Sequence, residues 1–237
     1  MKRYAHGLVL GKFYPPHAGH HHLVRTARER CERLTVLVCA ASVESVALRD
    51  RVAWMREVHP DTEVVGAVDD IPVESTDPAT WDAHIAIFRA AVPRRVDAVF
   101  TSEPYGTELA RRFRAESVCV DPDRTVFPVS GTAVREDPVG CWDFLEPPVR
   151  AALARRIVVL GAESTGTTTL ARALSARLRE RGGPWMTARF AERLSATGRR
   201  FLTVSGPPDQ RLATALAAVD AVLADGWQLA DPLPERR

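Results

Sequence analysis

The sequence lacks the charge excess and the long apolar runs that mark several classes of protein. Its 32 Lys and Arg residues nearly balance 30 Asp and Glu residues, which leaves a formal net charge of +2. A nucleic-acid-binding surface needs a broad basic field, so we expect no nucleic-acid partner. No apolar run is long enough to cross a bilayer, and the first residues lack the apolar core of a secretory signal. We therefore expect a cytoplasmic protein with no membrane partner.

Cysteine is also scarce, and no C-x-x-C spacing occurs. The four cysteines are Cys31, Cys39, Cys119 and Cys141. Their pattern indicates neither a zinc site nor a disulfide framework, so we predict buried thiols in a reducing compartment and no metal site built by the chain. Hydrophobic residues, by contrast, make up 46% of the 237 residues, which is enough for a folded core.

Apolar runs that suit buried parallel strands alternate with stretches of helical periodicity. We predict strands at residues 7–10, 34–40, 63–68, 97–102 and 117–120, and helices at residues 20–33, 47–59, 81–92 and 103–114. This alternation predicts an α/β fold with a Rossmann-like, doubly wound parallel sheet that binds its ligands at the carboxyl ends of the strands.

A domain boundary is predicted near residue 150. Pro147-Pro148 and Arg155-Arg156 precede a new apolar run at residues 157–160, which reads as a strand. We therefore expect a first domain at residues 1–150 and a second segment at residues 151–237. Because this segment has one confident strand, an amphipathic stretch up to Arg200 and a helix at residues 209–224, we expect a short α/β remnant that leans on the first domain or is partly mobile.

The stretch Gly11-Lys12-Phe13-Tyr14-Pro15-Pro16-His17-Ala18-Gly19-His20 joins the first strand to the first helix. Such a turn directs backbone N–H groups and the positive end of a helix dipole at a ligand, which favours phosphate. His17 and His20 add donors. His21 and His22 point about 100° and 200° away from His20 on a helix, so we predict that they are bystanders.

Three further histidines show no partner pattern. They are His6, His59 and His84, and we expect them at the surface or at helix caps.

A second motif, Val129-Ser130-Gly131-Thr132-Ala133-Val134-Arg135, opens a later helix. Ser130 and Thr132 can cap amides or meet phosphate oxygens, and Arg135 lies about one turn on, on the same side. An ordinary capped surface helix is the alternative for this motif taken alone.

Together the two motifs resemble the nucleotidyltransferase superfamily that shares its fold with class I aminoacyl-tRNA synthetases. The first motif is most similar to the NadR type, in which a nicotinamide mononucleotide adenylyltransferase is joined to a nicotinamide riboside kinase. The resemblance implies transfer of AMP from ATP, with Mg²⁺, to nicotinamide mononucleotide, giving NAD and pyrophosphate. The acceptor phosphate is itself the nucleophile, so catalysis requires in-line positioning and charge neutralisation.

The resemblance also implies roles for individual residues. Catalysis would fall to Lys12, His17, His20 and Arg135. ATP would be contacted by Gly11, Phe13, Gly19, Ser102, Arg124, Ser130, Gly131 and Thr132. The acceptor would be held by Arg51, in a helix after the second strand, and by Trp81, which resembles an aromatic that stacks on the nicotinamide ring. A pyridinium over an indole gains about 1–2 kcal/mol, although the residues alone leave Trp81 open as a core residue.

Two alternatives remain open for the function. The motifs specify the triphosphate better than the acceptor, so the acceptor could be another phosphorylated compound. A nucleotide-binding sensor without turnover is the second alternative, and the complete motifs argue against it.

A glycine-rich stretch, Gly161-Ala162-Glu163-Ser164-Thr165-Gly166-Thr167-Thr168, matches the P-loop pattern except that Thr167 occupies the lysine position. No strand-like apolar run ending in Asp follows it, since the apolar residues before Asp220 and Asp225 belong to the helix predicted at residues 209–224. The order along the chain, with the adenylyltransferase motifs first and the P-loop second, resembles the bifunctional NadR arrangement. We therefore predict a degenerate kinase segment without kinase activity. A structural or oligomerising role is expected for it, which leaves a homo-oligomer open.

Overall fold

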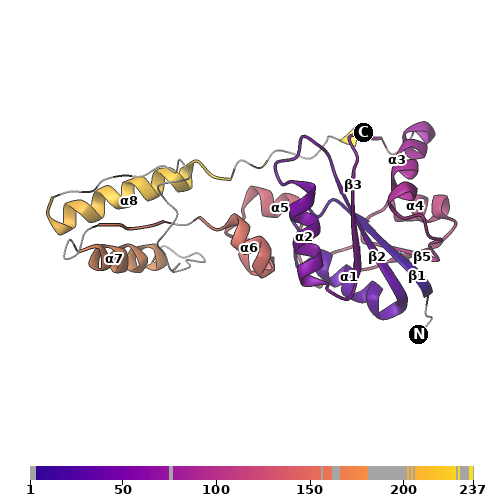
Figure 1. Cartoon of the computed structure of the whole chain (residues 1–237), viewed down its shortest axis with the longest axis horizontal. Helices are drawn as coiled ribbons and strands as arrows, with labels where there is room; N and C mark the ends of the chain where they lie inside the picture. The colour runs from indigo at the N-terminus through magenta and orange to yellow at the C-terminus, as the bar shows by residue number, and fades with distance from the viewer. Residues whose placement is uncertain are drawn as a thin grey trace. The chain divides into compact units, whose positions relative to one another are not determined.

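A five-stranded parallel sheet lies at the centre of the computed structural model, which describes residues 4–74, 77–155, 157–161, 166–180, 202, 204, 206–227, 229 and 235–236. The strands are β1 (Tyr4–Gly11), β2 (Cys31–Ala40), β3 (Glu63–Val68), β5 (Ala98–Thr101) and β6 (Glu116–Cys119). Their order is β3-β2-β1-β5-β6, and every neighbouring pair is parallel (Figure 1). This confirms the predicted Rossmann-like α/β fold. The winding reverses at β1, and sheets of this kind bind their ligands beyond the carboxyl ends of the strands at such a reversal.

Helices cover both faces of this sheet. They are α1 (Ala18–Arg30), α2 (Leu48–Val58), α3 (Pro78–Ala91) and α4 (Gly106–Phe113). Neighbouring residues of one strand point to opposite faces, so Val9 joins the core under α1 and α2 while Leu8 joins the core under α3 and α4. Both side chains are fully buried. The continuous apolar runs in the strands are explained by this cover on both faces.

Several element boundaries differ from the sequence prediction. Cys31–Arg33, predicted as the end of a helix, belong to β2, because Tyr4 and His6 of β1 pair with Cys31 and Arg33. Helix α3 begins at Pro78 rather than at Trp81, because the Asp77 carboxylate accepts hydrogen bonds from the amides of Ala79 and Thr80.

Residues 69–78, for which the sequence predicted neither a strand nor a helix, hold a short strand. This strand, β4 (Val73–Glu74), pairs in parallel with β7 (Glu235–Arg236). The sequence pattern gave no sign of it, since two residues are too few for a periodicity.

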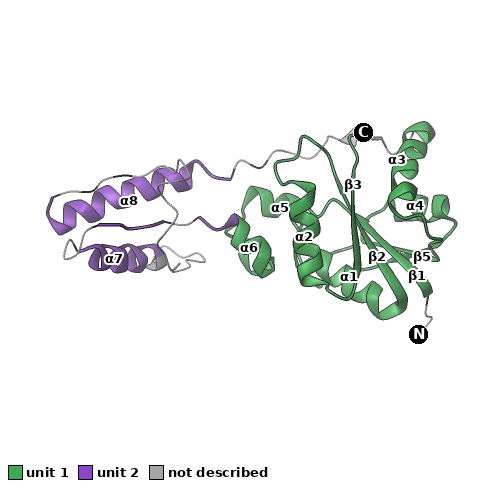
Figure 2. Cartoon of the chain, in the orientation of Figure 1, with its two compact units in different colours: residues 1–152, 229–237 green, residues 153–228 purple. Residues whose placement is uncertain are grey.

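Three short helices follow β6, namely α5 (Gly131–Glu136), a 3₁₀-helix at Trp142–Phe144 and α6 (Pro147–Leu153). Trp142, Leu145 and Val149 are buried among them. The chain contacts divide into a first unit of residues 1–152 and 229–237 and a second unit of residues 153–228 (Figure 2). Assignment of residues 1–150 and 151–237 to two functional domains stays a prediction.

The second unit contains α7 (Thr167–Glu180) and α8 (Pro208–Ala224). Leu170, Leu174 and Leu178 recur every four residues on α7 and are buried, as is Val219 of α8. The strand predicted at residues 157–160 is wrong, since those residues are not in a strand and the described part of this unit offers none to pair with. The amphipathic stretch predicted up to Arg200 lies outside the described residues. Among the helices that the structure describes, none is both long and apolar enough to cross a membrane.

Candidate active site

The predicted phosphate turn lies between β1 and α1, at the carboxyl end of the central strand. His17 is the N-cap of α1, and its side chain makes no capping hydrogen bond. The amides of the first helical turn are therefore not satisfied by a capping side chain, and they carry the positive end of the helix dipole. Phe13 adopts a left-handed backbone (φ 48°) and is 1% exposed, so the packing of its ring holds a conformation that costs free energy.

His17 and His20 form a stacked pair in this turn. Their ring centroids are 3.7 Å apart at an interplanar angle of 28°, and Phe13 packs on His20 at 4.9 Å. The Nδ1 atoms of both histidines are buried and have no hydrogen-bond partner among the described residues. Gly19 permits the stack, because a Cβ there would lie 3.3 Å from two atoms of the His17 ring. The structure thus brings the two predicted histidines together.

Burial governs the charge of this pair. It lowers the pKa of His17 to about 4, with a smaller contribution from the positive charge of Arg124. Burial also lowers the pKa of His20 well below its usual value, followed by the effects of His17, His21 and Arg124. Both imidazoles are therefore neutral at pH 7, and each offers one N–H donor and one acceptor. A bound polyanion would raise both pKa values, since an opposite charge favours the protonated form.

The second motif contacts the first directly. Ser130 is the N-cap of α5, and its Oγ accepts a hydrogen bond from the amide of Ala133 at 3.0 Å. Arg135 donates from Nη1 to the carbonyl oxygen of Tyr14 at 2.8 Å and from Nη2 to Oγ1 of Thr132 at 3.1 Å. A Cβ at Gly131 would lie 3.0 Å from the same Tyr14 oxygen, so glycine is needed for this close approach.

Lys12 lies at the start of the turn, next to a buried ion pair that sequence reasoning did not find. Its Nζ is 3.4 Å from Oε1 of Glu44, while Oε2 of Glu44 accepts a hydrogen bond from Nη1 of Arg51 at 2.7 Å. The side chains of Glu44 and Arg51 are both 0% exposed. Arg51, expected to contact the acceptor, is therefore placed in the interior of the first unit. A glutamate in a loop carried no motif that could have signalled its role.

Two other residues expected to contact ATP, Ser102 and Arg124, also have protein partners. Ser102 Oγ donates to the carbonyl oxygen of Val120 at 2.6 Å. Arg124 pairs with Glu103 at 2.8 Å and has a left-handed backbone (φ 51°). Arg124 is partly exposed and lowers the pKa of both His17 and His20, so its charge acts on the histidine pair.

Trp81 lies on α3 and packs partly against the core under α3 and α4. The guanidinium of Arg112 lies 5.5 Å from the centroid of its ring. One cation therefore already uses the aromatic surface that was expected to meet a pyridinium.

The prediction that His6 and His84 lie at the surface or at caps is wrong, whereas His59 is the C-cap of α2, one of the two expected positions. His21 is no loose bystander. All four are buried. His21 Nδ1 and His59 Nε2 are 2.9 Å apart, and His84 Nδ1 lies 2.6 Å from Oδ2 of Asp69. His6 contacts a carbonyl oxygen and a threonine hydroxyl. Internal partners distant in sequence allow these rings to be buried.

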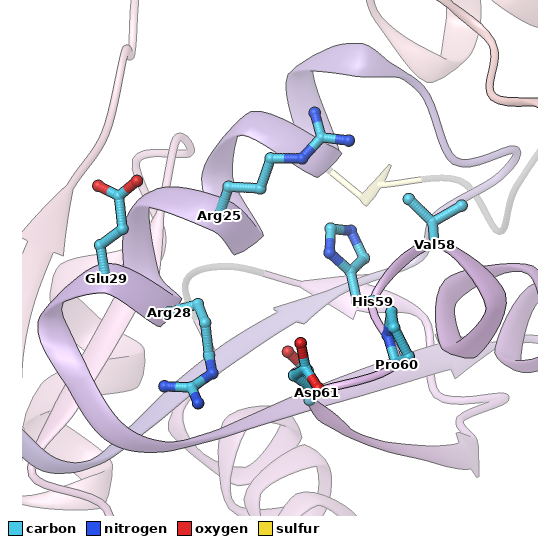
Figure 3. Close-up of a pocket in the computed structure, with 8 residues that line it drawn as sticks. Arg25, Arg28, Glu29, Val58, His59, Pro60 and Asp61 are labelled. Atoms are coloured by element: carbon cyan, nitrogen blue, oxygen red, sulfur yellow. The ribbon is translucent and has the colours of Figure 1, made fainter.

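A pocket of about 270 Å³ opens beside His59 (Figure 3). Arg25, Arg28 and Glu29 of α1 line one side, and Val58, His59, Pro60, Asp61 and Thr62 line the other. Arg25 is paired with Glu146 at 3.0 Å. Charges of both signs line this pocket, which gives it no strong preference for an anion.

Of the degenerate P-loop, the structure describes Gly161 and Gly166–Thr168. Gly166 has φ +79°, a conformation that favours glycine, and α7 begins at Thr167. A Cβ on Gly166 would lie 3.6 Å from two guanidinium nitrogens of Arg211. Thr168 is exposed.

Known proteins resemble this chain in sequence and in fold. Residues 8–137 match the family described as cytidylyltransferase-like. The trifunctional NAD biosynthesis/regulator proteins NadR of Escherichia coli and Salmonella typhimurium are 27% and 26% identical to this chain, in alignments of 187 positions that cover 71% of it. The chain spans only 45% of the length of each.

A crystal structure of NadR protein in complex with NR superposes with a TM-score of 0.60 at 20% identity, covering 74% of this chain and 53% of that one. A second, of NadR protein in complex with NAD and AMP-PNP, gives 0.59 at 21% identity, covering 75% and 55%. The match to residues 8–137 covers both motifs and the whole parallel sheet except its first four residues. The chain therefore belongs to the cytidylyltransferase-like nucleotidyltransferases and is a relative of the NadR proteins.

Proposed function

We propose that this protein transfers the AMP group of ATP to nicotinamide mononucleotide, giving NAD and pyrophosphate. The observation that carries the proposal is the convergence of the two motifs: Arg135 bonds to Tyr14 within the turn that presents the His17–His20 stack. The relationship to NadR supports the choice of acceptor. The acceptor is part of the proposal, because the chain spans less than half of the length of those relatives.

The proposed mechanism is in-line attack of the acceptor's 5′-phosphate on the α-phosphorus of ATP. The acceptor oxygen is already anionic, so no general base and no covalent intermediate is needed. The neutral His17 and His20 each donate an N–H to phosphate oxygens on which charge develops, and the first-turn amides of α1 add further donors. Lys12 and Arg135 supply positive charge for the triphosphate.

Magnesium enters this proposal as part of the Mg·ATP substrate. No group of three or more His, Cys, Asp or Glu side chains in the described part of the chain is arranged to hold a metal. Glu44, the carboxylate next to Lys12, is occupied by Arg51. We therefore propose that Mg²⁺ binds mainly through the substrate phosphates, as it usually does in enzymes that act on nucleotides.

A second candidate, transfer of a nucleotide to a different phosphorylated acceptor, is favoured by one observation. Arg51 is buried, and Arg112 lies over Trp81, so both residues expected to hold nicotinamide mononucleotide are engaged with the protein. The turn between β1 and α1, which would bind the triphosphate, does not depend on contacts of Arg51 or Trp81 with the acceptor.

The test is a matrix of donors and acceptors followed by pyrophosphate release. ATP and CTP, each with Mg²⁺, are incubated with nicotinamide mononucleotide, with nicotinate mononucleotide and with other phosphorylated acceptors. The proposal expects release only with ATP and nicotinamide mononucleotide, together with NAD detected by mass spectrometry. Release with another acceptor alone would establish the second candidate. Nucleotide binding without release in any combination would indicate a sensor.

A further inference from the structure

We propose that Glu44 is a positioning residue for Lys12, holding the lysine ammonium beside the phosphate turn before ATP binds. The inference deepens the proposed function and rests on the ATP-binding role of that turn. It concerns a carboxylate that no motif identifies.

The two oxygens of Glu44 are used differently. Oε2 accepts hydrogen bonds from Nη1 of Arg51 at 2.7 Å and from the amide of Ala41 at 3.2 Å. Oε1 is buried and accepts no hydrogen bond from the described residues, yet Lys12 Nζ lies 3.4 Å away. A buried acceptor without a hydrogen bond costs free energy. The lysine is the group that offsets this cost electrostatically.

Lys12 and Arg51 differ in what they can do next. The Lys12 side chain is 35% exposed, whereas the Arg51 side chain is 0% exposed. Arg51 also donates to the carbonyl oxygens of Val46 and Lys12 and lies 4.2 Å over the ring of Tyr14. Arg51 is therefore fixed with Glu44, while Lys12 can move from Oε1 to a phosphate oxygen.

The charge balance explains why a carboxylate beside a phosphate site is tolerated. Glu44 and Arg51 neutralise each other, so the cluster of three presents the single positive charge of Lys12. A free lysine side chain loses up to about 2 kcal/mol of rotamer entropy when it is fixed. Glu44 confines the ammonium near its working position, so less of that entropy is lost when ATP binds.

The experiment is a double-mutant cycle with Lys12→Met, Glu44→Gln and both changes together, read as the dissociation constant of Mg·ATP. Lys12→Met should weaken binding by about 10- to 100-fold, as loss of a charged hydrogen bond does. Glu44→Gln, which keeps an oxygen for Arg51, should weaken it by about threefold or more. If Glu44 acts through Lys12, the double variant should match Lys12→Met within about twofold.

A double variant whose loss equals the product of the two single losses would overturn the proposal, as would a Glu44→Gln protein with wild-type affinity. Glu146→Gln is the matched control: it neutralises a carboxylate paired with Arg25 and should leave ATP affinity unchanged. If Glu44→Gln fails to fold because Arg51 is left unpaired, the same cycle of Lys12→Met and Glu44→Gln is repeated in an Arg51→Gln background.

A second readout does not depend on nucleotide binding or on activity. The rate at which an acylating reagent modifies Lys12 in the free protein is followed by mass spectrometry. Loss of the ion pair in Glu44→Gln should raise this rate severalfold, and an unchanged rate would contradict the proposal. A protein that shows the labelling effect and the ATP coupling but releases no pyrophosphate would retain this inference while the proposed function fails.

Discussion

Arg135 donates a hydrogen bond of 2.8 Å to the carbonyl oxygen of Tyr14, a residue 121 positions earlier in the chain. The same guanidinium lies 4.9 Å from the centroid of the Tyr14 ring. One side chain thus joins the two motifs, because Tyr14 lies in the turn that leads to the histidine pair. The relationship makes Arg135 both a structural clamp and a candidate ligand of the triphosphate.

Replacement of Arg135 by Ala should lower kcat/KM for ATP by about 10²–10³ and weaken ATP binding. Arg135→Lys should recover little, because an ammonium cannot reproduce the fork that meets Tyr14 and Thr132 at once. Steady-state pyrophosphate release measures both. Arg111→Lys, at an exposed ion pair with Glu108, is the control and should behave as the wild type. Full activity of Arg135→Lys would refute the fork argument.

Replacement of His20 by Ala should lower kcat by about 10²–10⁴, since it removes a donor expected to act in the transition state. The ring packs on His17 and Phe13 and leaves Nδ1 without a partner, so its loss removes some packing but no internal hydrogen bond to that atom. We expect the melting temperature to fall by only a few degrees. Near-wild-type turnover in a folded His20→Ala protein would remove the proposed mechanism.

The free energy of unfolding should fall as the solution is acidified from pH 7 to pH 4. Burial lowers the pKa of His17 to about 4, of His21 to about 3 and of His59 to about 4, from an ordinary value of 6.5. Between pH 6.5 and 4 the unfolded chain therefore binds more protons than the native state. The stability that these three histidines contribute is fully present above pH 6.5. It is lost as the pH falls, by up to about 1.4 kcal/mol per pH unit for each histidine.

Urea unfolding at pH 7, 6 and 5 measures this slope. His21 and His59 share a hydrogen bond, so their protonation is coupled and the double variant His21→Leu/His59→Leu is the informative comparison. Its stability should depend less steeply on pH than that of the wild type. A wild-type stability that is flat or rises on acidification would contradict the burial of these rings.

Local patterns predicted the sheet and the two motifs because those features depend on neighbouring residues. The run at residues 7–10 became β1, and the turn before His17 led into α1, as their periodicity and position indicated. The Glu44–Arg51–Lys12 cluster had no such signal, since the loop glutamate meets a lysine 32 residues earlier only after β1 and β2 pair.

The buried histidines escaped prediction for the same reason. A histidine in a sequence is read as polar, and only its partner decides whether it can be buried. His6 contacts the carbonyl oxygen of Arg95, which is 89 residues away in the sequence. His84 contacts Asp69, which is 15 residues earlier and precedes β4. The strand expected at residues 157–160 was a wrong prediction of the opposite kind, because the local pattern was present and the partner was not, in the part of the unit that the structure describes. An apolar run forms a strand only where another strand lies beside it.

The last prediction is that this protein does not phosphorylate nicotinamide riboside at a useful rate. A P-loop lysine carries a positive charge that follows the γ-phosphate into the transition state, and the hydroxyl of Thr167 has neither that charge nor that reach. Loss of such a charge costs several kcal/mol, or several powers of ten in rate. Thr167→Lys alone should not restore the reaction, since Asp220 and Asp225, which follow apolar residues, belong to α8 and to its C-cap and not to a strand end that could help place magnesium.

The measurement is formation of ADP and nicotinamide mononucleotide from ATP and nicotinamide riboside, in the intact protein and in Thr167→Lys. Pyrophosphate release with nicotinamide mononucleotide in the same samples shows that each protein is folded and competent. Silence in both proteins would agree with the loss of more than the lysine. Kinase activity in the intact protein would show that a charge from elsewhere serves the γ-phosphate, and activity gained only in Thr167→Lys would show that the lysine was the one missing part.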